Sequence, residues 1–232
     1  MPAPAALPQG SRVYAIGDVH GCLSRLRALH AAIARDLAAR PVASPLLVHL
    51  GDYVDRGPDS AGVIRYLRDG FPAARSINLM GNHERMMVDA LEGIEPAAFA
   101  HWLANGGRAA LKSWGAGEPY EHETAVRMVP AEDRAFLRNL LTYHREGGYL
   151  FVHAGIRPGL PLERQSAHDL LWIREPFLSW AASLGCVVVH GHTPMEGPVV
   201  KVNRIGIDTG AVLGGPLTCA VLDQDELRFL FA

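Results

Sequence analysis

Three short apolar runs in the first ninety residues each end in a glycine followed by an acid or an amide. Residues 13–16 and 45–50 precede Gly-Asp, and residues 76–80 precede Gly-Asn. Between the first two runs, leucine and isoleucine recur at spacings of three and four over residues 23–37, which is the pattern of an amphipathic helix. Strands that alternate with helices of this length predict βαβ units and a largely parallel sheet.

The second half of the chain has a different pattern. Residues 96–145 have the apolar spacing of helices, and strand-like runs follow at residues 149–153, 187–190, 199–207 and 217–222. We therefore expect an α/β fold in a single domain, residues 11–232, with a helical insertion at about 93–147. The first ten residues contain three prolines and are expected to form a flexible, unpaired tail.

The composition excludes several classes of protein. Twenty-two Lys and Arg against 24 Asp and Glu leave a formal charge of −2, which argues against non-specific binding to nucleic acid or to an anionic membrane. The three cysteines form no C-x-x-C pair, so neither a disulfide framework nor a structural zinc site is expected. The sequence has no signal-peptide pattern and no apolar stretch of ~18 residues, which favours a cytoplasmic protein.

Polar side chains follow one predicted strand after another. They are Asp18 and His20, Asp52 and Asp55, Asn82 and His83, His153, and His192. Because the carboxyl ends of parallel strands meet at one edge of a sheet, these groups are expected to converge where ligands bind. Carboxylate and imidazole donors without cysteine suit Mn, Fe or Zn, and a carboxylate can bridge two ions about 3.5–4 Å apart.

The five segments that carry these residues, GDVHG, GDYVDRG, GNHE, HAG and GHT, occur in an order that resembles the phosphoprotein phosphatases within the calcineurin-like metallophosphoesterases. DLLWIRE and IDTGAV further resemble the bacterial and phage branch, the lambda phosphatase-like serine/threonine protein phosphatases. The resemblance implies a four-layer αββα sandwich with mixed sheets. It also implies two divalent metal ions, with Mn as the expected activating metal and Fe or Zn as alternatives.

The resemblance assigns a role to each residue of the predicted site. The implied metal ligands are Asp18 and His20 for the first ion, Asp52 as the bridge, and Asn82, His153 and His192 for the second ion. Arg56 and Arg174 would bind the phosphoryl oxygens, for which a planar guanidinium is well suited. His83, oriented by Asp55, would protonate the leaving oxygen, since an imidazole titrates near neutral pH.

Structural alternatives stay open for several of these residues. Arg174 lies in a segment with three apolar neighbours and could form an ordinary salt bridge, and Asp55 could cap a turn. His49 and His190 are interpreted as structural histidines. The tryptophans at 102, 114 and 172 are interpreted as core residues.

The expected function is hydrolysis of phosphate monoesters by attack of a metal-bound hydroxide on phosphoserine and phosphothreonine in proteins, with phosphotyrosine as a further substrate. The expected partner is therefore a phosphorylated protein or peptide, with no nucleic acid or membrane, and the chain is expected to be a monomer. The alternative is a dinucleoside polyphosphate hydrolase such as a diadenosine tetraphosphate hydrolase. In that family the second motif usually lacks the acid found here as Asp55, and the third usually ends in Asp where this chain has Glu84. A non-catalytic metal-binding interaction module is a further alternative.

Overall fold

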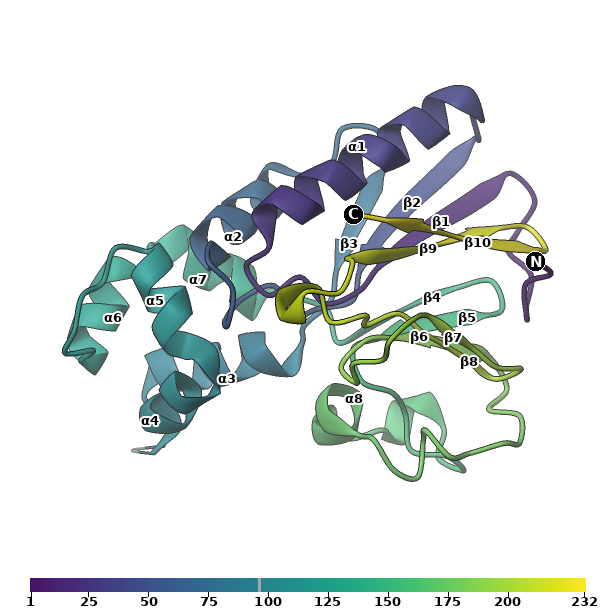
Figure 1. Cartoon of the computed structure of the whole chain (residues 1–232). Helices are drawn as coiled ribbons and strands as arrows, with labels where there is room; N and C mark the ends of the chain where they lie inside the picture. Colours follow the sequence, from purple (N-terminus) through teal and green to yellow (C-terminus); the bar gives the residue numbers. More distant parts are fainter. Residues whose placement is uncertain (96) are drawn as a thin grey trace.

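A computed structural model describes residues 1–95 and 97–232, and Pro96, the predicted start of the helical stretch, lies outside the described residues. Two five-stranded mixed sheets lie face to face (Figure 1). The first has the order β10–β9–β1–β2–β3, with bounds Glu226–Phe231, Thr218–Asp223, Ser11–Ile16, Ser44–His49 and Arg75–Asn78. The second has the order β4–β5–β6–β8–β7, with bounds Tyr143–Glu146, Tyr149–Val152, Val187–His190, Arg204–Gly206 and Val199–Val200.

The parallel βαβ prediction is confirmed for the first ninety residues. Strands β1, β2 and β3 are parallel neighbours, with Ser11 opposite Ser44 and Leu46 opposite Arg75. They are connected by α1 (Leu23–Ala39) and α2 (Ser60–Asp69). Strands β9 and β10 extend the same sheet in the antiparallel sense, so the sheet as a whole is mixed.

Alternation of side chains along the strands builds the layers. In β1, Val13 and Ala15 point into the apolar layer between the two sheets, whereas Tyr14 and Ile16 pack with residues of α1 and α2. The outer face of the second sheet packs against α8 (Ala167–Trp172) and the segment around it. Figure 1 shows α1 and α8 on opposite outer sides. The order is therefore helix, sheet, sheet, helix, as the resemblance implied.

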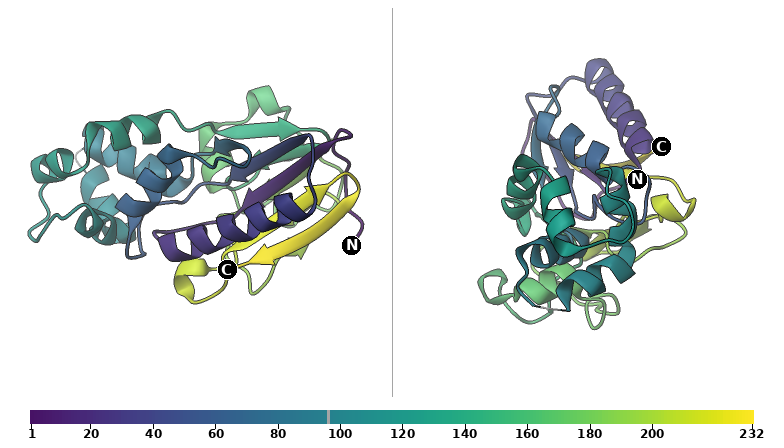
Figure 2. Two further views of the ribbon diagram at one scale, coloured as in Figure 1. Left: turned by 90° about the horizontal axis from the view of Figure 1, so that it is seen from above. Right: turned by 90° about the vertical axis from the view of Figure 1, so that its left-hand side faces the viewer.

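The helical insertion extends beyond one end of the sheets, away from the N-terminus (Figure 2). Helix α3 (Asn82–Glu92) precedes it, and the helices within it are α4 (Ala98–Trp102), α5 (Arg108–Ser113), α6 (His122–Met128) and α7 (Ala131–Arg138). A wide, π-type turn, Leu103–Gly107, joins α4 to α5 and is kinked at Gly106. Among the described residues, no helix combines the length and apolar character that a membrane span needs.

The predicted boundaries need three corrections in the second half. Tyr143–Glu146, inside the stretch expected to be helical, forms β4, because pairing with β5 outweighs its polar local sequence. The run 199–207 divides into β7 and β8, which pair antiparallel with each other. Glu226–Phe231, for which no strand was predicted, forms β10 along β9.

The N-terminal residues are not an unpaired tail. The backbone N–H groups of Ala3 and Leu7 donate to the carbonyl oxygens of Asp225 and Gln224 in the turn between β9 and β10. Leu7 is buried in the layer between the sheets. The apolar residues among the prolines therefore cover an end of the core that would otherwise face water.

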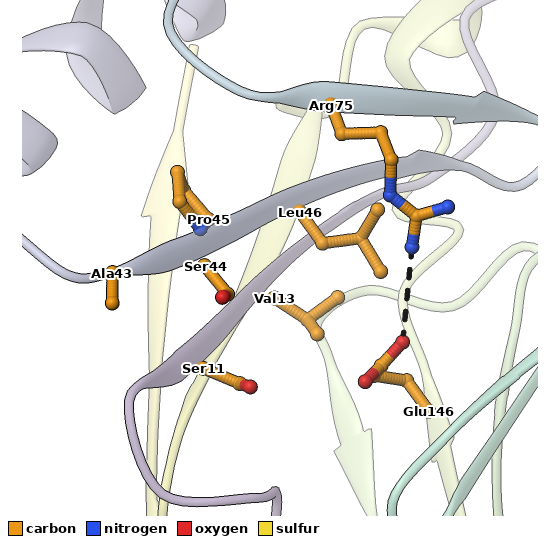
Figure 3. Close-up of a pocket in the computed structure, with 8 residues that line it drawn as sticks. All are labelled: Ser11, Val13, Ala43, Ser44, Pro45, Leu46, Arg75 and Glu146. Carbon is orange, nitrogen blue, oxygen red and sulfur yellow. Dashed lines mark ion pairs between the residues drawn. The ribbon is translucent and has the colours of Figure 1, made fainter.

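A cavity of about 350 Å³ opens between the sheets where β1, β2 and β3 begin (Figure 3). Ser11, Ser44 and Leu46 line it, and an ion pair between Arg75 Nη2 and Glu146 Oε2, 3.9 Å apart, lies beside it. Ligands of parallel sheets bind at the opposite, carboxyl ends of the strands. The cavity is therefore separate from the predicted site, which follows those carboxyl ends.

Candidate metal centre

The residues that follow β1, β2, β3, β5 and β6 converge at one edge of the sandwich. Asp52, after β2, lies in the middle: its Oδ2 is 3.5 Å from Nε2 of His20, and its Oδ1 is 3.4 Å from Nε2 of His153. Two clusters of potential metal ligands share this carboxylate, namely His20–Asp52–His83 and Asp52–His153–His192. The location of Asp52 is therefore that of a bridging ligand.

Asn82, at the start of α3, closes the second cluster. Its Oδ1 lies 2.9 Å from Nε2 of His153 and 3.0 Å from Nδ1 of His192. Nδ1 of His153 donates to the carbonyl oxygen of Leu50, so Nε2 is the ring nitrogen that faces Asn82 Oδ1. An imidazole nitrogen and an amide oxygen are both groups that can bind a divalent metal ion.

The spacing of these donors also fits a metal ion. Adjacent ligands of an octahedral ion with bonds of about 2.1 Å lie ~3 Å apart. The contacts of Asn82 have this spacing, and those of Asp52 are slightly longer. The side chains therefore fit a pair of divalent ions, with no sulfur ligand among them.

Asp18, after β1, joins the centre beside His192. Both of its carboxylate oxygens accept the backbone N–H of His192, at 3.2 and 3.1 Å. A Cβ on Gly191 would lie 2.0 Å from Asp18 Oδ1, so only glycine lets the two strand ends approach this closely. Burial, and then the negative charges of Asp208 and Asp52, raise the pKa of Asp18 well above its ordinary value. A bound cation would offset that repulsion.

The imidazoles of His20 and His192 are held in the neutral form that a metal requires. Burial lowers the pKa of His20 to about 4, and burial together with the neighbouring His153 lowers that of His192 to about 3. Nδ1 of His20 donates to the carbonyl oxygen of Val54, which leaves Nε2 as the acceptor nitrogen, 3.5 Å from Oδ2 of Asp52. At neutral pH these rings are lone-pair donors and not cations.

His83 and Asp55 form a buried pair beside the cluster. Nδ1 of His83 lies 2.7 Å from Oδ2 of Asp55, and both side chains are almost inaccessible to solvent. Burial alone would lower the pKa of His83, but the charges of Asp52 and Asp55 outweigh it and raise the pKa. The contact supports the orienting interpretation of Asp55 over the turn-capping one.

The two arginines are exposed at the same edge. Nη1 of Arg56 donates to Nε2 of His20 at 2.8 Å, which places the guanidinium directly over the metal cluster. Arg174 lines a cavity of about 430 Å³ together with His192 and Trp172. Within the described residues Arg174 makes no ion pair, so the salt-bridge alternative has no partner there.

Residues 11–229 match the family described as calcineurin-like phosphoesterase. The chain belongs to that family. The phosphoesterase is 32% identical over 218 residues to serine/threonine-protein phosphatase 1 of Salmonella typhimurium, with 90% of each chain covered. It is 30% identical to the asymmetrical bis(5′-nucleosyl)-tetraphosphatase PrpE of Bacillus subtilis, which covers 88% of this chain and 87% of that protein.

Two further comparisons extend the range of relatives. The phosphoesterase is 33% identical over 155 residues to the symmetrical bis(5′-nucleosyl)-tetraphosphatase of Aromatoleum aromaticum; this match covers 46% of that protein, so the chain spans about half its length. A solved structure of a candidate diadenosine tetraphosphatase superposes with a TM-score of 0.70 at 23% identity, and 98% of each chain is covered. That structural likeness shows the fold alone.

The backbone of the phosphoesterase is strained where the site residues lie. Six non-glycine residues of the described chain have φ in the left-handed region. One of them, Gln224, lies in the turn before β10, away from the site. The other five are His20 (φ 42°), Asp52 (52°), Asp55 (72°), Arg56 (65°) and His192 (66°). Such conformations cost of order 1–3 kcal/mol each and persist where surrounding structure enforces them, as at ligand sites.

Three residues near the site of the phosphoesterase had no assigned role from the sequence. The buried Glu84 carboxylate accepts the backbone N–H groups of Asp52, Tyr53, Val54 and Gly81, and so fixes the loop after β2. Asp208 lies beside Asp18. Trp102 donates its indole N–H to Asp55. The sequence signal that could have identified Glu84 is its location in GNHE, and that for Asp208 is its location in IDTGAV. For Trp102 the sequence showed only the apolar spacing of a buried helical residue.

The structural interpretation of the two other histidines agrees with their contacts. Nε2 of His49 lies 2.9 Å from Nε2 of His30, between β2 and α1 and away from the cluster. His190 is buried, with Nδ1 donating to the carbonyl oxygen of Gly191, and it packs against Phe177.

Proposed function

We propose that this phosphoesterase is a metal-dependent phosphatase of phosphoserine and phosphothreonine in proteins. The observation that carries the proposal is the His83–Asp55 pair beside the metal cluster, with its nitrogen and oxygen 2.7 Å apart. Serine and threonine leave as poorly stabilised alkoxides, so their esters need a positioned general acid more than aryl esters do. The relative whose match covers 90% of both chains is named a serine/threonine-protein phosphatase, which also supports this substrate class.

In this proposal the strand-end residues hold two divalent ions. Asp18 and His20 would hold one ion, Asn82, His153 and His192 would hold the other, and Asp52 would be shared by both. Manganese is the proposed metal, with iron or zinc as alternatives, since oxygen and imidazole donors suit all three. When bound, the ions supply an acidified water and neutralise charge on the phosphoryl group. The side chains around them complete the site.

Arg56 and Arg174 would bind the phosphoryl oxygens. The Arg56 guanidinium already lies 2.8 Å from the Nε2 of His20, and a dianionic phosphate offers a stronger acceptor than a neutral imidazole. Arg174 lies in the segment after α8 and lines the same cavity as His192. Two guanidinium groups would hold the phosphoryl group in line with the leaving oxygen.

His83 would then donate a proton to the leaving oxygen. As the P–O bond breaks, its electron pair stays on the ester oxygen, which takes the proton of the imidazole and departs as an alcohol. Asp55 keeps Nδ1 of His83 engaged, so Nε2 is the proton donor. The segments DLLWIRE and IDTGAV support placing the chain beside the lambda phosphatase-like enzymes.

A dinucleoside polyphosphate hydrolase is the second candidate. The match to PrpE covers 87% of that protein. The match to the serine/threonine-protein phosphatase covers 90% of its length, which is nearly the same. The metal cluster serves either reaction. A polyphosphate leaves as a phosphate anion that needs little protonation, so this candidate gives no reason for the buried His83–Asp55 pair.

Direct competition between the two substrates tests the proposal. The manganese-loaded protein is incubated with equal concentrations of a phosphoserine peptide and diadenosine tetraphosphate, and both products are followed by phosphorus NMR. We expect a higher kcat/KM for the peptide. A tenfold or greater preference for the dinucleotide would instead establish the second candidate.

A further inference from the structure

Trp102, the last residue of α4, directs its indole N–H at the Asp55 carboxylate. Nε1 lies 2.9 Å from Oδ1 and 3.1 Å from Oδ2, although the two residues are 47 positions apart in the sequence. Both side chains are fully buried. Within the described chain, the side-chain donors to this carboxylate are Trp102 and His83. A buried indole N–H usually has a hydrogen-bond partner, and here that partner is the carboxylate that contacts His83.

The indole is held in place by close packing on its faces. A Cβ on Gly107 would lie 2.7 Å from Cδ2 and Cε2 of the ring, so the backbone at this glycine packs directly against the indole. Phe99 meets it edge-on, with ring centroids 6.0 Å apart. The N–H vector is therefore fixed by the insertion and not by Asp55 alone.

The same turn contacts the neighbouring arginine. The carbonyl oxygen of Gly106 accepts the backbone N–H of Arg56 at 3.2 Å. Gly106 has φ of 115°, and a Cβ there would lie 2.8 Å from Cγ and N of Arg56. Only glycine adopts this conformation without cost and leaves room for the arginine. The turn between α4 and α5 thus packs against both Asp55 and Arg56.

We propose that Trp102 is a positioning residue for the general acid. Its indole N–H engages both oxygens of Asp55, which prevents rotation of the carboxylate and keeps Oδ2 on Nδ1 of His83. The helical insertion thereby sets the direction of proton donation. This inference rests on one part of the proposed function, namely that His83 protonates the leaving group of a phosphate ester. It does not depend on which ester is the natural substrate.

Trp114 provides a matched control in the same insertion. Its Nε1 donates to Oδ2 of Asp133 at 2.9 Å, and Asp133 is also fully buried. The other partner of Asp133 is Arg68, and neither residue belongs to the metal cluster. Trp114→Phe therefore removes the same kind of indole–carboxylate bond at a distance from the reaction.

The experiment compares Trp102→Phe and Trp114→Phe on aryl phosphates whose phenols differ in acidity, with bound metal measured in each variant. For Trp102→Phe we expect kcat to fall about tenfold on the ester of the least acidic phenol and to change little on the ester of the most acidic one. The tenfold loss is a part of the ~10²–10⁴-fold that a general acid supplies. KM and metal content should stay at wild-type values. Trp114→Phe should keep the wild-type dependence on leaving group.

Equal losses of kcat on all the aryl phosphates in Trp102→Phe, or no loss on any of them, would overturn the inference.

Proton NMR gives a second readout that needs no turnover. The downfield resonance of the His83 Nδ1–H, assigned by its absence in Asp55→Asn, should shift in Trp102→Phe and not in Trp114→Phe. An unchanged resonance would also refute the positioning role. Inactivity on phosphopeptides alone would refute the proposed substrate and leave this comparison intact, because it uses aryl esters.

Discussion

Nδ1 of His83 lies 2.7 Å from Oδ2 of Asp55, and the rings of His83 and His20 are only 4.7 Å apart. His83 thus contacts both Asp55 and His20, and His20 is a potential ligand of the metal cluster. Loss of His83 could therefore act through proton transfer or through the metals, and these two effects are separable.

We expect His83→Ala to lose ~10²–10⁴-fold in kcat/KM on a phosphoserine peptide and clearly less on an aryl ester of an acidic phenol. The alkoxide needs a proton, whereas the phenolate departs without one. Steady-state kinetics on both substrates measure the difference, and His144→Ala, in edge strand β4, is the control. Equal losses accompanied by lower metal content would show that His83 acts through the metal cluster.

Metal removal should abolish hydrolysis. After exhaustive chelation and gel filtration we expect no turnover of an aryl phosphate, with recovery on adding manganese, because the proposed nucleophile is a water acidified by the metal. Asp52→Asn should be among the most damaging single changes and should lower the metal stoichiometry, since Asp52 lies in both ligand clusters. Asp133→Asn removes an equally buried carboxylate elsewhere and should leave the stoichiometry unchanged. Full activity of the chelated protein would contradict the metal-dependent mechanism.

Arg174→Ala should reduce kcat/KM by about 10²–10³-fold, the effect of losing one preorganised donor to the transition state. Metal content should be unaffected, because Arg174 is exposed and lies outside both clusters. Arg157→Ala, on the same cavity but paired with Asp169, is the matched control and should lose much less. Wild-type kcat/KM in Arg174→Ala would remove this residue from the site.

The buried pair of His30 and His49 should make stability depend on pH. Burial lowers the pKa of His30 to about 4, and burial with the adjacent His30 lowers that of His49 to about 3. Below pH ~6.5 the unfolded chain protonates these residues while the folded chain does not. The free energy of unfolding therefore falls as the pH drops from about 6.5 to about 4, by up to ~1.4 kcal/mol per pH unit for each histidine.

Denaturant unfolding in chelator at several pH values between 7 and 4 measures this slope. In the double variant His30→Leu, His49→Leu, the slope should be shallower than in the wild-type protein, whatever the change in absolute stability. His101→Leu, an exposed residue of α4, should keep the wild-type slope. Identical slopes in the double variant and the wild type would contradict the assignment.

The sequence by itself determined the three parallel strands of the first sheet and the set of residues that converge at its edge. Short, continuous apolar runs such as Val13 to Ile16 indicate strands buried on both faces, and the glycine after each run ends the strand. Because the carboxyl ends of parallel strands meet, the acids, histidines and asparagine that follow them had to lie close together. The order of the five motifs then indicated the family.

Tertiary structure decided the contacts that no local pattern encodes. Strand β4 has a polar sequence and forms because β5 offers it hydrogen-bond partners. Glu84, one residue after His83, reaches back across 30 or more positions to accept the N–H groups of the loop after β2. These contacts hold Asp52 in the left-handed backbone region, which aspartate adopts more readily than most residues.

Trp102 shows most directly what only the folded chain reveals. Its apolar spacing predicted a buried residue, and it is buried. Its hydrogen bond to Asp55 depends on the kinked turn at Gly106 and on the packing of Gly107 against the indole, which orient the ring after the insertion has docked. Periodicity determines which face of a helix is apolar, whereas the direction of one N–H is set by packing between segments distant in sequence.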